Sequence, residues 1–200
     1  MTWNWQQRDW PRFKYDTAAL AALEDKFLHR SGILLGAYKH IRDDDKQVLT
    51  ISLISEEALK TSEIEGEYLN RDSLQSSVRR QFGLQTDNGT ISPAEQGIAE
   101  MMVDLYRHFN TPLTERLLFA WHRMIMAGRR DVGDVGRYRT HEEPMQVVSG
   151  SPQAAKVHFE APPSARMADE MRRFIKWYKA VSADGVDQLP AFSLTGTPVL

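Results

Sequence analysis

The sequence has no cysteine, so it offers neither a disulfide framework nor a thiolate metal site. It has no long apolar run: no segment approaches the roughly 20 apolar residues that a membrane-spanning helix needs. It also has no basic excess, because the formal net charge is -2 and both signs are spread along the chain. These absences argue against nucleic acid and membrane as partners, and we expect a cytoplasmic protein.

What the sequence does have is apolar residues at helical spacing. With 200 residues and 42% hydrophobic content, the chain can bury a sizeable core. The spacing predicts helices over residues 17–40, 70–82, 93–109, 114–125 and 164–178, and over 48–66 as one long helix or two consecutive ones. Asp16 and Ser92 are expected helix caps, and Gly66 and Gly83 are expected helix stops. Residues 145–150 and 156–159 predict one β-hairpin, so the expected fold is all-α with a single β-hairpin.

Three smaller patterns have plain interpretations. Residues 43–45, all aspartate, are expected to form a solvated turn between helices. The aromatic residues near the start are expected to hold that segment onto the helices that follow. Acidic residues around the glycine-rich loop do not have the ligand spacing of a calcium loop, so we assign no metal site to Asp131, Asp134, Glu142 and Glu143.

A short polar motif ends the second helical stretch. Thr61 and Glu65 are four residues apart, so they share one helical face, and Gly66 follows. A carboxylate there could reach across to an arginine. Taken alone, such a short pattern is more often a solvated glutamate before a glycine cap.

Several segments around this motif agree in order and spacing with one family. They are Trp3-Asn4-Trp5-Gln6, Trp10-Pro11, the motif itself, Gly136-Arg137-Tyr138-Arg139, Pro144-Met145-Gln146-Val147-Val148-Ser149-Gly150 and Val157-His158-Phe159-Glu160-Ala161-Pro162-Pro163. Together they resemble Fic (filamentation induced by cAMP) proteins that carry an N-terminal helical domain and an inhibitory helix. The resemblance divides the chain into a helical domain over 1–90, an incomplete Fic domain over 91–190 and a departing tail over 191–200.

The resemblance implies an adenylyltransferase that moves AMP from ATP, with Mg²⁺, to a hydroxyl side chain of a target protein. In that family the glutamate corresponding to Glu65 pairs with a catalytic-motif arginine and blocks placement of the ATP γ-phosphate. Thr61, Glu65 and Gly66 are therefore the expected regulatory residues. The hairpin would be a flap that registers the target, with Met145, Gln146, Val147, Val148, Ser149, Gly150, Val157 and His158 as its binding residues.

The family's catalytic signature, His-x-Phe-x-Asp/Glu-Gly-Asn-Gly/Lys-Arg, is absent from these 200 residues. None of the six histidines lies in such a turn, so we assign no catalytic residue and predict that this polypeptide transfers nothing by itself. A frameshift near Ala191, another truncation and a natural regulatory remnant all stay open. The alternative is a non-enzymatic, antitoxin-like module that supplies its inhibitory helix to a Fic core in trans. Whether the chain forms a homo-oligomer is also open.

Overall fold

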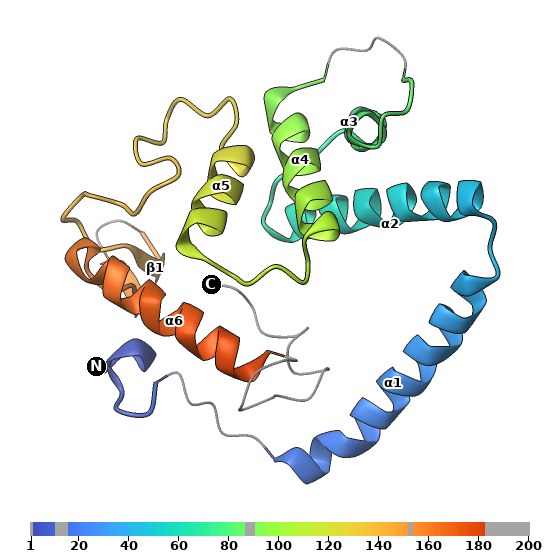
Figure 1. Cartoon of the computed structure of the whole chain (residues 1–200). Helices are drawn as coiled ribbons and strands as arrows, with labels where there is room; N and C mark the ends of the chain where they lie inside the picture. The colour runs from blue at the N-terminus through green and yellow to red at the C-terminus, as the bar shows by residue number, and fades with distance from the viewer. Residues whose placement is uncertain (1, 11–15, 87–90, 152–153, 183–200) are drawn as a thin grey trace. The chain divides into compact units, whose positions relative to one another are not determined.

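The computed structural model describes residues 2–10, 16–86, 91–151 and 154–182, and the tail at 191–200 lies outside these ranges. The described residues are mostly helical with one two-stranded antiparallel hairpin, which confirms the expected fold class. No helix in them is long and apolar enough to cross a bilayer. The elements, coloured along the chain in Figure 1, are α1 (Thr17–Lys39), α2 (Asp43–Ile64), α3 (Arg71–Gln81), α4 (Pro93–Arg107), α5 (Glu115–Ile125), β1 (Gln146–Ser149), β2 (Lys156–Glu160) and α6 (Met167–Val181).

Side-chain caps begin two of the helices as expected. Asp16 Oδ1 accepts from the backbone N–H groups of Ala18 and Ala19, at 2.9 and 3.2 Å. Ser92 and Glu95 form a reciprocal capping box at the start of α4, where Pro93 occupies the first turn. Each cap pairs backbone donors that a helix end otherwise leaves without an intrahelical partner.

The expectation for residues 43–45 is wrong. These aspartates form the first turn of α2, which is a single helix of 22 residues. Negative side chains are favourable there because the unpaired N–H groups of the first turn carry partial positive charge. Lys46 adds to this: its ammonium lies 2.9 Å from Asp43, and this hydrogen bond and charge lower the pKa of the Asp43 carboxyl.

The chain packs as two compact units. Unit 1 comprises the described residues of 1–31, 113–115 and 137–200, and unit 2 comprises those of 32–112 and 116–136. The predicted division at residue 90 into a helical domain and a Fic core stays a prediction.

Unit 2 has the larger apolar core, where α2, α3 and α4 meet (Figure 1). Its buried side chains come from helical positions three, four or seven residues apart, which lie on one face of each helix. They are Ile51, Ile54 and Ala58 of α2, Leu74 and Val78 of α3, and Ala99 and Val103 of α4. A close approach joins α4 to α5, because a Cβ placed on Gly97 would lie 1.9 Å from the carbonyl oxygen of Met124.

Unit 1 is built around the hairpin and α6, and the start of the chain packs against both. Trp5 is buried and donates its Nε1–H to the carbonyl oxygen of Glu160 at 2.7 Å. The ring of Trp3 meets Phe159 edge-on, with the ring centres 5.9 Å apart. The aromatic segment is therefore held by the hairpin and by α6, whose Arg173 donates to the Trp10 carbonyl at 3.0 Å.

Candidate functional site

The Thr61 to Gly66 motif forms the end of α2, and the glycine stop is confirmed. Gly66 has φ of +82°, a conformation that glycine adopts without strain. Its N–H donates to the carbonyl of Glu63 at 3.1 Å, and the N–H of Glu67 donates to the carbonyl of Ser62 at 2.8 Å. This is the double hydrogen bond of a Schellman motif, and it fixes how the chain leaves the helix next to Glu65.

Glu65 differs from the other glutamates around it. Over residues 56–67, all of which the structure describes, Glu65 is the one glutamate whose carboxylate has no hydrogen bond or ion pair. The partners of the other four are Arg71 for Glu56, the Thr61 hydroxyl for Glu57 at 3.3 Å, Lys60 for Glu63 at 2.7 Å and Arg129 for Glu67 at 3.8 Å. The Glu65 carboxylate is therefore exposed and free to accept a donor.

Large apolar side chains flank this carboxylate. Ile64 and Tyr68 are each 83% exposed, far more than side chains of that size usually are when a helix end packs on its own core. We refer to Ile64, Glu65 and Tyr68 as the Glu65 surface. It combines an exposed, unpaired carboxylate with two exposed apolar side chains.

The side chains of Thr61 and Glu65 are not hydrogen-bonded to each other. The two residues share a helical face, but the Thr61 hydroxyl donates back to Glu57, one turn towards the N-terminus. The only recorded bond between them is the backbone one, from the Glu65 N–H to the Thr61 carbonyl at 3.3 Å.

Glu95 anchors the segment that follows the motif, a role that the sequence analysis did not predict. Its buried carboxylate accepts from the backbone N–H of Asn70 at 2.9 Å and from the Ser73 hydroxyl at 2.6 Å. The N–H of Ser92 donates to the same carboxylate at 3.2 Å. Three donors from two helix starts therefore converge on the Glu95 side chain, and one of them, the Asn70 N–H, lies four residues beyond Gly66 in the chain.

The predicted flap is present as the antiparallel pair β1 and β2. Every residue of β1 is exposed, and in the described part of the chain its outer edge pairs with no other strand. The register places Val147 opposite Phe159 and Val148 opposite Val157, so His158 is the extra residue of a β-bulge. The His158 Nε2 lies 2.6 Å from the Ser149 hydroxyl. The expected flap residues are thus brought together, while their binding role stays a prediction.

Two features support the segment before the hairpin. In unit 2, Gly136 donates its N–H to His122 Nδ1 at 3.0 Å and accepts from Arg123 at 3.1 Å. In unit 1, the guanidinium of Arg139 donates to the Pro162 carbonyl, and its buried Nε has no partner among the described residues. Burial lowers the pKa of Arg139. Both ends of the Gly136 to Arg139 motif therefore have a structural role: Gly136 is hydrogen-bonded within unit 2, and Arg139 is hydrogen-bonded within unit 1.

ATP and Mg²⁺, the cofactors that the resemblance implies, stay a prediction for this chain. The described residues contain no group of three or more histidine, aspartate or glutamate side chains arranged to hold a metal ion. The glycine-rich phosphate turn that the resemblance would require is not in the sequence either.

Residues 3–84 match a family described as a domain of unknown function (DUF4172). The matched segment is less than half of the chain and contains α1, α2, the Glu65 surface and α3. No curated protein matches the chain. The match marks these helices as a sequence unit shared with other proteins and gives them no activity.

Proposed function

We propose that the end of α2 is an inhibitory element of Fic-type AMP transfer, in which Glu65 pairs with the arginine of a catalytic motif. The reaction it would restrain is the transfer of AMP from ATP to a hydroxyl side chain of a target protein. The single observation that carries this proposal is the free, exposed carboxylate of Glu65 among neighbours that are all engaged.

The physical basis is the complementarity of carboxylate and guanidinium. A carboxylate with both oxygens free can accept two parallel N–H bonds from one arginine. An arginine held in this way is no longer available to a phosphate, and the negative charge beside it repels the ATP γ-phosphate. The exposed Ile64 and Tyr68 would supply the apolar area that such a contact buries.

The residues around Glu65 hold the end of α2 in one conformation, so the Glu65 carboxylate would be offered to a partner in a fixed direction. The Schellman bonds set the exit direction of the chain at Gly66. The ion pair between Glu67 and Arg129 and the Glu95 hydrogen bonds to Asn70 and Ser73 hold the following segment within unit 2. Little of the segment's freedom would remain to be lost on binding, which favours affinity.

The hairpin would contribute target recognition. An unpaired outer edge such as that of β1 can add an extended peptide by main-chain hydrogen bonds, with side-chain pockets giving specificity. ATP and Mg²⁺ belong, in this proposal, to the catalytic core that carries the motif. The expected cytoplasmic location is where ATP-dependent transfer would take place.

The proposal has two forms, which differ in where the catalytic core lies. In one form the core is encoded with this chain, and Glu65 restrains its own polypeptide. In the other the chain is a non-enzymatic, antitoxin-like module that acts on a separate core. The second form is favoured by the Glu65 surface, because its three residues and their supports all lie within unit 2.

The test measures AMP transfer by a Fic core that lacks its own inhibitory helix, using radiolabelled ATP and a protein target, with and without this chain. We expect the chain to reduce the transfer and Glu65→Gln to relieve the inhibition. Glu63→Gln is the matched control, because it removes an exposed carboxylate two residues away that is already paired with Lys60. Unchanged transfer with the wild-type chain would reject the second form of the proposal. Equal relief by Glu63→Gln would reject the assignment to Glu65.

A further inference from the structure

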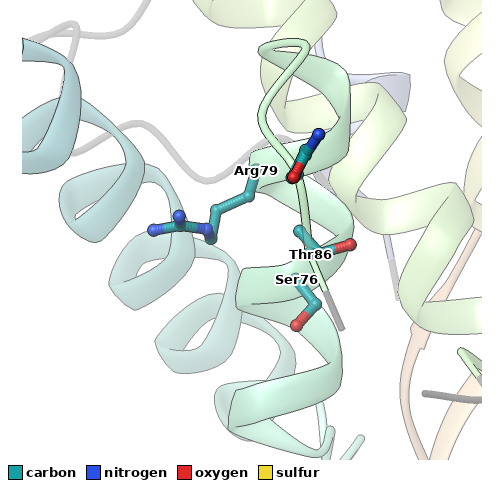
Figure 2. Close-up of a pocket in the computed structure, with 4 residues that line it drawn as sticks. Ser76, Arg79 and Thr86 are labelled. Atoms are coloured by element: carbon teal, nitrogen blue, oxygen red, sulfur yellow. The ribbon is translucent and has the colours of Figure 1, made fainter. Parts of the chain in front are cut away.

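A polar cavity of about 320 Å³ lies in unit 2 at the C-terminal end of α3. Its lining residues are Ser76, Arg79, Gln85 and Thr86. Figure 2 shows Ser76 and Arg79 projecting from α3, and Thr86 on the segment that follows it. Because Ser76 and Arg79 are three residues apart, their side chains lie on the same face of the helix.

The four described lining residues are rich in hydrogen-bond donors, and none of them carries a carboxylate. Arg79 is half-buried, and the structure records no hydrogen bond or ion pair for its guanidinium within the described ranges. The Thr86 hydroxyl accepts from Arg80 Nε at 2.8 Å, so its own proton remains available to a ligand. The Ser76 hydroxyl and the Gln85 amide complete a set of donors that favours an oxygen anion.

The C-terminal end of a helix carries partial negative charge and would normally disfavour an anion. Here that effect is weakened, because the last carbonyls of α3 already accept hydrogen bonds. The N–H of Gly83 donates to the Arg80 carbonyl at 2.9 Å, and the N–H of Leu84 donates to the Arg79 carbonyl at 3.1 Å. Gly83 has φ of +74°, which completes the cap. These bonds reduce the negative potential that uncapped carbonyls would direct into the cavity.

We propose that this cavity binds the phosphoryl group of a small ligand of about the size of a sugar phosphate. A phosphoryl group presents three terminal oxygens and a charge near -2, so it can take up more of these donors than a carboxylate can. The unpaired guanidinium of Arg79 can donate to two of those oxygens. The hydroxyls of Ser76 and Thr86 and the amide of Gln85 can donate to the remaining oxygen and to a sugar hydroxyl. The volume lies at the lower end of the range for small-molecule sites.

The test is an NMR titration of the ¹⁵N-labelled chain with inorganic phosphate, ribose 5-phosphate and ribose. We expect saturable shifts at the four lining residues and at the Arg79 side-chain Nε–H with both phosphates, at millimolar concentration, and none with ribose. Arg79→Gln should weaken binding about tenfold or more, since it removes a charged hydrogen-bonding partner. Ser76→Ala is a second, milder variant and should weaken binding by a smaller factor.

Arg116→Gln is the matched control. Arg116 is an exposed arginine on α5 for which the structure records no pair among the described residues, so this variant removes the same charge elsewhere in unit 2. It should leave the phosphate affinity unchanged. The proposal is overturned if phosphate causes no saturable shifts at the lining residues, if ribose shifts them equally, or if Arg116→Gln weakens binding as much as Arg79→Gln.

Discussion

Replacing Glu95 by glutamine is a direct test of how unit 2 is held together. The glutamine side chain has the same shape, but one carboxylate oxygen becomes an NH₂ group. Glu95 as a whole is only 8% exposed, and its carboxylate accepts from Asn70, Ser73 and Ser92. Glutamine can present its carbonyl to the oxygen position that receives two donors, and its NH₂ then faces the Asn70 N–H. At least one buried donor loses its partner.

The size of the effect follows from that loss. Leaving a buried donor without a partner costs about 1–3 kcal/mol, and bonds to a charged acceptor are at the upper end of that range. We therefore expect Glu95→Gln to lower the free energy of unfolding of unit 2 by about 2 kcal/mol. Glu100→Gln, on the same helix, changes a carboxylate whose recorded hydrogen bond comes from Gln96 near the surface. It should change the stability by less than about 0.5 kcal/mol.

The same contacts predict a dependence on pH. Burial raises the pKa of Glu95, but the hydrogen bonds from Ser73, Asn70 and Ser92 outweigh it, so the pKa is lower than the ordinary value of 4.5. A folded-state pKa below the unfolded one means that this stabilisation is present above pH 4.5 and is lost as the pH falls through the folded value. The difference between wild type and Glu95→Gln should therefore shrink below pH 4.5.

Urea unfolding followed by circular dichroism, together with hydrogen exchange of the α4 amides, measures both effects. The exchange data report unit 2 separately from unit 1. A variant as stable as wild type at neutral pH, or a stability difference that does not change between pH 7 and pH 3, would show that the carboxylate is not the anchor described above.

Three further predictions concern packing, the hairpin and one surface ion pair. Gly97→Ala should destabilise unit 2 by about 2 kcal/mol, because its Cβ would collide with a carbonyl of α5. In thermal unfolding, Gly32→Ala should instead stabilise by up to about 1 kcal/mol, since no atom lies within 4 Å of its Cβ position. Trp5→Phe removes the indole hydrogen bond to β2, so the hairpin amides should exchange about tenfold faster with deuterium, and unchanged exchange would contradict the packing described. The carboxyl of Asp131 should titrate with a pKa of about 2 in a ¹³C NMR experiment and return towards 3.8 in Arg129→Gln, because the arginine hydrogen bond is the main cause of the shift.

The sequence predicted those parts of the fold that local chemistry decides. The caps at Asp16 and Ser92 and the stops at Gly66 and Gly83 are local, because each depends on a residue's own backbone preferences and on neighbours within one turn. The hairpin was also found, because its two β-rich runs lie close together in sequence.

Features that depend on distant contacts could not be read in this way. Glu95 accepts from Asn70 and Ser73, which precede it by 25 and 22 residues, and only packing of the helices brings them together. The motif alone shows that Thr61 and Glu65 share a face, but not that the Thr61 hydroxyl turns towards Glu57. The error at residues 43–45 was of another kind, because a run of aspartates suits a turn and the first turn of a helix equally well.

The contact between Trp5 and Glu160 joins positions that are 155 residues apart. Its consequence is that the first residues of the chain are a structural part of the hairpin. An affinity tag fused to Met1, or a peptidase that trims the first few residues, would act on β2 as directly as a mutation within the strand. Preparations that differ only in how their N-terminus was processed should therefore differ in the behaviour of the hairpin.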